Sequence, residues 1–87
     1  MTTQEKINEL ESRQIVLSNE MASSDAHAAK CIKVGLNFGE AYPEELERYK
    51  ASRNEYNANE VALSELYAAL EKEAQADAAD LTIEQIP

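Results

Sequence analysis

The chain of 87 residues contains no tryptophan, one phenylalanine, two glycines, two prolines and one cysteine. Aromatic residues this scarce leave little material for a large globular core, and glycine and proline this scarce leave little for the turns of a sheet. A single cysteine excludes a disulfide within the chain and is typical of a reducing compartment. Alanine and glutamate are abundant instead, and both favour long helices. The composition therefore predicts an all-α protein.

Positive charge is also scarce, because 8 Lys or Arg against 17 Asp or Glu give a formal net charge of −9. The acidity lies mainly in residues 57–87, where seven acidic side chains are opposed by Lys72 alone. Attachment to nucleic acid or anionic membrane is driven by Lys and Arg, so this balance argues against both. Residues 1–10 alternate polar and charged side chains, without the apolar run of a signal peptide or membrane span. We therefore expect a cytoplasmic protein.

The start of the first helix is marked by Thr2 and Glu5, which stand in the spacing of a capping box. In that motif the hydroxyl and the carboxylate each bind a free backbone N–H at the helix start. We therefore expect a first helix over about 3–34. Residues 23–25, two serines and an aspartate, are good N-cap residues and weak interior ones, so a kink or a fresh start near Ser23 is the alternative to a continuous helix.

The connection between two helices is predicted around the two glycines. Gly35 suits the left-handed conformation that ends many helices, and Gly39 should keep the following residues from re-entering one. Pro43 fits the first turn of the next helix, where its missing N–H costs nothing. The predicted organisation is a helical hairpin over 1–79, with a helix over about 3–34, a turn over 35–42 and a helix over about 43–79, followed by a C-terminal tail over 80–87.

A seven-residue repeat marks one face of each predicted helix. In the first helix the row comprises Ile7, Leu10, Gln14, Leu17, Met21, Ser24, Ala28 and Cys31. In the second helix it comprises Tyr42, Tyr49, Tyr56, Leu63 and Leu70, with Leu46, Arg53, Glu60, Tyr67 and Ala74 beside them. Such a repeat keeps one stripe of a helix against another helix, which predicts a long, coiled-coil-like antiparallel hairpin. The expected interface residues, within the hairpin or between copies, are Leu10, Leu17, Met21, Leu46, Tyr56, Leu63, Leu66, Tyr67 and Leu70.

Apolar residues also lie outside these two rows. They are Ile15, Val16, Ala22 and Ile32 on the first helix, and Ala62, Leu66 and Ala69 on the second. Two helices share one interface and would leave these residues exposed to solvent. A chain this short also buries only about 60% of the surface that its unfolded form exposes. A second apolar face needs a second partner, so we expect self-association into a dimer or higher oligomer that forms a helical bundle. The polar residues Gln14, Arg53 and Glu60 would then fix register and partner choice.

The strongest metal-like signal is the pair His27 and Cys31, which are four residues apart on one helix face. A structural zinc site needs four ligands, and the chain has no second cysteine or histidine to complete one. As a nucleophile and base the pair would lack an orienting residue and an oxyanion hole. We therefore expect a packed cysteine near a surface histidine, with no catalytic residue, metal or cofactor. The expected protein is not an enzyme but a helical interaction or assembly protein.

Positive charge gathers around the predicted turn, where aromatic side chains are also found. The candidate residues for binding an anion or a nucleotide are Lys30, Lys33, Tyr42, Arg48, Tyr49 and Arg53. A base can stack on a tyrosine ring while cations hold its phosphate, and helix N-termini favour anions. The alternative is that the tyrosines pack in the interface and the cations pair with nearby glutamates. No glycine-rich phosphate loop is present in the sequence to decide between them.

Further signals are the segment Glu9-Leu10-Glu11-Ser12-Arg13, the following Leu17, the turn, and the periodic tyrosines of the second helix. In this outline the chain resembles small helical-hairpin accessory proteins of bacteriophages. One such group forms oligomeric sponges for cyclic-oligonucleotide immune signals, using an aromatic residue to stack a base and a lysine to hold phosphate. The resemblance implies a phage accessory or virion-associated protein, in the host cytoplasm or the virion, with a host or virion protein as partner. Alternatively, the resemblance implies that the chain sequesters a cyclic nucleotide signal or inhibits a host defence factor.

Overall fold

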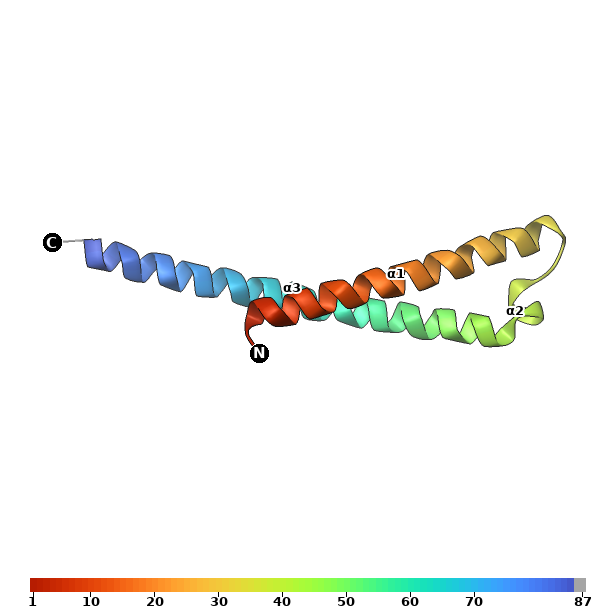
Figure 1. Cartoon of the computed structure of the whole chain (residues 1–87), viewed down its shortest axis with the longest axis horizontal. Helices are drawn as coiled ribbons and strands as arrows, with labels where there is room; N and C mark the ends of the chain where they lie inside the picture. The colour runs from red at the N-terminus through yellow and green to blue at the C-terminus, as the bar shows by residue number, and fades with distance from the viewer. Residues whose placement is uncertain (86–87) are drawn as a thin grey trace.

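The computed structural model describes the backbone of residues 1–85 and the side chains of residues 1–76. Three helices follow one another: α1 (Thr3–Lys33), the short α2 (Phe38–Ala41) and α3 (Pro43–Gln85) (Figure 1). Helices α1 and α3 run antiparallel, and α2 lies at the turn between them (Figure 1). No strand occurs within residues 1–85. The prediction of an all-α chain built on a long helix pair is confirmed.

Both ends of α1 follow from local residues. The Thr2 side chain accepts a hydrogen bond from the backbone N–H of Glu5 at 3.1 Å, which caps the helix start. At the other end Gly35 has φ +76°, and Leu36 donates its N–H to the Cys31 carbonyl at 2.8 Å. This bond and the left-handed glycine form a Schellman motif. Between its ends α1 is continuous, so the break considered near Ser23 does not occur.

The turn contains α2, and its presence shows that our expectation for Gly39 was wrong. The Asn37 side chain accepts from the backbone N–H of Glu40 at 3.0 Å and starts a four-residue helix in which Gly39 lies. A Cβ atom on Gly39 would lie 2.9 Å from Cδ2 of Leu46. Gly39 therefore lies within a short helix, against the flexible end of the Leu46 side chain, and does not prevent a helix.

Helix α3 begins at Pro43 and continues to Gln85, six residues beyond the predicted end at 79. Most of the expected tail over 80–87 is therefore helical, while residues 86–87 lie outside the described part of the chain. The physical reason is that no glycine or proline occurs between residue 44 and Pro87. Helix α3 extends well past the start of α1 (Figure 1). At that start the Thr3 hydroxyl donates to the Glu73 carboxylate at 2.7 Å.

The hairpin is a thin rod of 75 × 21 × 15 Å with a radius of gyration of 20.8 Å. A compact domain of this length would have a radius of gyration of about 12 Å. The surface exposed to solvent is 6512 Å², whereas a folded monomer of this mass exposes about 5,100 Å². Within the described side chains, the fully buried apolar residues are Ile7, Leu17, Cys31 and Leu63. One hairpin alone therefore has a very small core.

The row predicted on the first helix is the face of α1 that packs on α3. Its eight residues are all buried or half-buried, and Ile7 and Leu17 are only 1% exposed. On α3, Tyr49, Tyr56 and Leu70 are half-buried and Leu63 is buried. Tyr42, the first of that series, is 41% exposed because it lies in the turn before the helix begins.

The second row predicted on α3 is wrong by one residue. Arg53, Glu60, Tyr67 and Ala74 are exposed, although Leu46 is half-buried. The half-buried residues that actually complete the α3 face are Glu45, Ser52, Asn59 and Leu66. Ala62 and Ala69, expected outside the contact, are also half-buried, as is Leu66. Of the nine expected interface residues, Tyr67 alone is exposed, at 48%.

Candidate interaction surfaces

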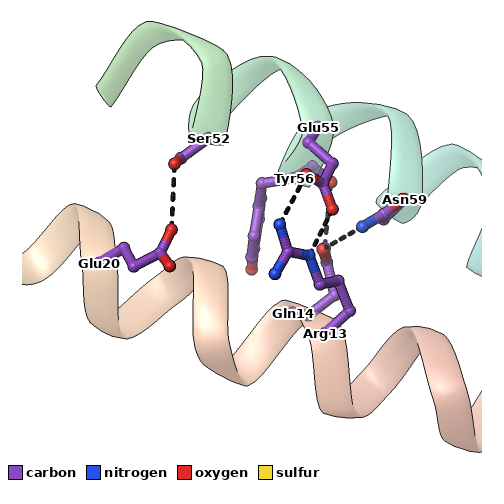
Figure 2. Close-up of polar contacts among 7 residues, drawn as sticks. All are labelled: Arg13, Gln14, Glu20, Ser52, Glu55, Tyr56 and Asn59. Atoms are coloured by element: carbon purple, nitrogen blue, oxygen red, sulfur yellow. Dashed lines mark hydrogen bonds and ion pairs between the residues drawn. The ribbon is translucent and has the colours of Figure 1, made fainter. Parts of the chain in front are cut away.

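The contact between α1 and α3 contains a row of polar side chains that recurs every seven residues on α3. Asn59 donates to the Gln14 side chain at 3.0 Å, and Ser52 donates to the Glu20 carboxylate at 3.3 Å (Figure 2). One further heptad along, the Glu45 carboxylate lies 2.8 Å from Nδ1 of His27. These partners explain why the polar row, and not the more apolar one, faces α1. Glu45, Ser52 and Asn59 each find a polar side chain of α1 as partner.

Gln14 is the most buried polar residue, with 7% of its surface exposed. Its Nε2 donates to the Tyr56 carbonyl at 3.0 Å, while its Oε1 accepts from Asn59 (Figure 2). The same Nε2 also donates to the Glu60 carboxylate at 2.9 Å. The amide is therefore fully engaged, as the specificity role predicted for Gln14 requires. Glu60 accepts its hydrogen bond from Gln14 at the exposed edge of the contact. The guanidinium carbon of Arg53 lies 6.0 Å from the centre of the Tyr49 ring.

Arg13 and Glu55 form an ion pair on the edge of the same contact. The guanidinium Nε and Nη2 atoms lie 2.6 and 2.9 Å from the two carboxylate oxygens (Figure 2). The hydrogen bond from Arg13 holds the pKa of the Glu55 carboxyl below its ordinary value, and the bond to Glu55 raises the pKa of Arg13. Further along α3, loss of solvent around the Tyr67 phenol raises its pKa, with the negative charges of Glu11 and Glu60 adding to the effect.

An open groove of about 550 Å³ runs beside these polar contacts. It is lined by Arg13, Glu20, Ser23, Ser24, Glu45, Arg48, Tyr49, Ala51, Ser52 and Glu55. Three carboxylates and two arginines face this space, and one of the arginines is already paired with Glu55. Arg48 makes no ion pair with any side chain among residues 1–76. The groove is thus mildly acidic, and neither Glu20 nor Ser52 was among the residues predicted for a site.

The candidate anion-binding residues are only partly brought together. Arg48 and Tyr49 both line the groove, and Arg48 also lines a second hollow of about 300 Å³ with Tyr42. Lys30 and Lys33 are exposed on the last turns of α1 and line neither hollow. Arg53 lies over the Tyr49 ring.

The turn end is held by three rings and one carboxylate. The His27 ring lies 5.4 Å from the Phe38 ring and 4.2 Å from the Tyr42 ring, measured between centroids. Its Nδ1 faces Glu45, while Cys31 is buried at 3% exposure. Among the side chains of residues 1–76 no cluster of three metal-ligating residues occurs. Within the structure His27 and Cys31 are packing residues of the hairpin end.

The outward face of α1 is apolar and carries little charge. Ile15 is 63% exposed, Val16 45% and Ile32 76%, and Ala22 and Ala29 between them are exposed as well.

None of the helices described in residues 1–85 has the length and hydropathy needed to cross a membrane. No family model, curated protein or solved structure matches the chain.

Proposed function

We propose that the chain is a non-enzymatic interaction or assembly protein of the cytoplasm, which works by presenting helix faces to other helices, first of all those of its own copies. The observation that carries this proposal is the exposure of Ile15 and Ile32, 63% and 76%, on a rod with so small a core. Both residues lie in one row of exposed residues along α1, and exposed apolar surface is typical of interaction sites.

The polar side chains of the hairpin support the same function. Hydrogen bonds join α3 to three residues of α1, namely Arg13, Gln14 and Glu20, and these bonds help to align the two helices. A buried polar contact such as that of Gln14 specifies register at some cost in stability. A hairpin with a defined register presents its outer faces in a defined geometry, which assembly requires.

Resemblance to phage accessory hairpins points to a host or virion protein as a further partner. A second candidate function, sequestration of a cyclic nucleotide, is favoured by the pairing of Arg48 with Tyr49 in the groove. Cations and aromatic rings together are the usual means of holding a phosphate and a base. Glu20, Glu45 and Glu55 in the same groove oppose an anion, so assembly is the function that the geometry supports better.

Native mass spectrometry of the protein purified from its own host tests these functions together. Assembly predicts a mass of two or more copies, with or without a second protein. Sequestration predicts a retained small molecule of nucleotide mass. A chain that emerges as a bare monomer, free of any protein or ligand at micromolar concentration, would contradict both.

A further inference from the structure

A row of exposed residues on α1 repeats with the same period as the face of α1 that packs on α3. Its members are Ile15, Ser18, Ala22, Asp25, Ala29 and Ile32, and each follows an inner residue by one position. All six are exposed. One residue corresponds to a rotation of about 100° around a helix, so this row, which we name the α1 outer face, lies roughly a quarter turn from the inner contact. A helix of a four-helix bundle meets its two neighbours on two such adjacent faces.

Charge is sparse on the α1 outer face, where Asp25 is the one charged residue of the six. From Ser12 to Ala29, three of the twelve exposed residues of α1 are charged, whereas from Glu44 to Glu60 six of the ten exposed residues of α3 are charged. Two of those on α1, Arg13 and Glu20, are bound to α3. Asp25 is therefore the single remaining charge on this stretch of α1. Depletion of charge is the compositional mark of the buried centre of an interface.

The occupant that best fits this face is a second copy of the chain. The protein exposes 6512 Å², about 1,400 Å² more than a compact monomer of its mass. A standard interface takes about 800 Å² from each partner. One such contact would thus bring the exposed surface toward the usual value. The small side chains of Ser18, Ala22 and Ala29 allow two α1 helices to approach closely.

Charge also decides the relative direction of the two copies. In a parallel pair Asp25 would lie against Asp25 of the second copy, and the acidic regions over 57–87 would lie side by side. In an antiparallel pair the acidic regions lie at opposite ends, which lowers their repulsion. Antiparallel packing of this heptad row also places Ile15 opposite Ile32 of the second copy, Ser18 opposite Ala29 and Ala22 opposite Asp25. Both large apolar side chains then find an apolar partner.

We propose that two copies of the chain pair antiparallel through the α1 outer face, with Ile15 of each copy packed against Ile32 of the other. This inference rests on the proposed assembly function, for which it names the partner and the face. The dimer is a bundle in which the two α1 helices form the central contact and each α3 helix remains on the outside. The α3 helices stay available to a further partner.

Cysteine cross-linking tests the pairing directly. In a Cys31→Ala background, Ile15→Cys and Ile32→Cys are made as separate proteins, and oxidation is followed by non-reducing electrophoresis. A mixture of the two should form a mixed disulfide dimer, at least ten times more than either protein alone, because a disulfide needs Cβ atoms about 4 Å apart. Cross-linking of each single variant with itself would indicate a parallel pair and overturn the proposal. So would a mixture that cross-links no better than its components.

A second experiment compares two matched surface substitutions by light scattering and circular dichroism. Ala22→Glu lies in the centre of the α1 outer face, and Ala58→Glu is the control on the exposed side of α3. The first should convert a dimer into a monomer with unchanged helicity, and the second should leave the dimer intact. A dimer lost with Ala58→Glu and retained with Ala22→Glu would overturn the inference. If the wild type is a monomer in solution but retains another protein from its host, this pairing fails while the interaction function stands.

Discussion

Gln14 and Asn59 face each other across the hairpin, with the Asn59 Nδ2 atom 3.0 Å from the Gln14 Oε1 atom (Figure 2). The two remaining hydrogen bonds of the Gln14 amide are made to Tyr56 and Glu60, so one α1 side chain contacts more than a full turn of α3. A shift of either helix by one residue would break all three bonds in a nearly buried site. The amide therefore fixes the alignment of α1 on α3.

Replacing Gln14 tests this role. Gln14→Ala should lower the free energy of unfolding by about 1–3 kcal/mol, because partners on α3 lose their hydrogen bonds at a poorly hydrated site. Asn19→Ala is a suitable control, since Asn19 is an exposed residue on the same helix. Urea denaturation followed by circular dichroism measures both. Equal stabilities for the two variants would mean that the Gln14 contacts do not contribute.

The face of α3 that packs on α1 can be tested with one substitution made at two positions. Leu63, at 4% exposure, faces α1, whereas Val61 is 62% exposed two residues away. Leu63→Asp should cost several kcal/mol, about 3–5, because it removes a core side chain and introduces an unpaired charge. Val61→Asp should change the free energy of unfolding of the hairpin by less than about 1 kcal/mol. Comparable losses in thermal denaturation would place the contact on a different face.

Local residues predicted much of this fold. Thr2 with Glu5, Gly35 and Pro43 mark helix ends through contacts a few residues away, and they lie where the sequence places them. The face of α3 could not be chosen in the same way. Rows that include either Leu46 or Glu45 satisfy the heptad spacing equally. Without knowledge of the partners on α1, the row that contains the apolar Leu46 is the better prediction.

The partners that decide between those rows are distant in sequence. His27 is 18 residues from Glu45, and Gln14 is 45 residues from Asn59. A polar residue with a matching partner can occupy a helix contact that composition alone would assign to leucine or tyrosine. The groove was missed for the same reason, because Glu20 and Ser52 meet only once the hairpin closes. The exposed positions of Ile15 and Ile32, in contrast, follow from the inner α1 row and were predictable.

The two glycines should respond differently to the same substitution. Gly35 has φ +76°, which an L-residue adopts at a cost of about 1–2 kcal/mol, so Gly35→Ala should be destabilising by that amount. Gly39 has an ordinary backbone, and the Cβ of an alanine there would lie 2.9 Å from the end of the flexible Leu46 side chain and 3.5 Å, an ordinary contact, from Oδ1 of Asn37. Gly39→Ala should therefore be close to neutral in thermal denaturation. A larger loss for Gly39→Ala than for Gly35→Ala would contradict this assignment.

Acid should weaken the ion pair between Arg13 and Glu55. Because the folded-state pKa of Glu55 lies below its ordinary value of 4.5, the pair stabilises the fold above that pH and the contribution is lost as the pH falls through the lower, folded-state pKa. NMR titration of the Glu55 carboxyl carbon measures this directly. In Arg13→Met the pKa of Glu55 should return upward, because the hydrogen bond that lowers it is lost. A Glu55 titration that is the same with and without Arg13 would rule out the pairing in solution.

The choice between assembly and nucleotide sequestration depends on Arg48, which lines one hollow together with Tyr49 and the other together with Tyr42. Sequestration predicts that a cyclic dinucleotide binds the wild type in a calorimetric titration. A charge-assisted hydrogen bond to phosphate is worth about 1.5–3 kcal/mol, so Arg48→Ala should then weaken binding at least tenfold. The control is Lys50→Ala, because Lys50 is an exposed cation within 3.6 Å of Glu47 and lines neither hollow.

The double variant Lys30→Ala with Lys33→Ala separates the two placements of such a site. Loss of binding in this variant, with Arg48→Ala binding normally, would put the ligand on the end of α1 that the sequence suggested. Loss in Arg48→Ala alone would put it in the groove. Absence of heat with every cyclic nucleotide tested would exclude sequestration of these ligands, and it is the outcome expected from a groove in which Glu20, Glu45 and Glu55 outnumber the two arginines. Assembly through the α1 outer face would then account for the exposed apolar residues without any ligand.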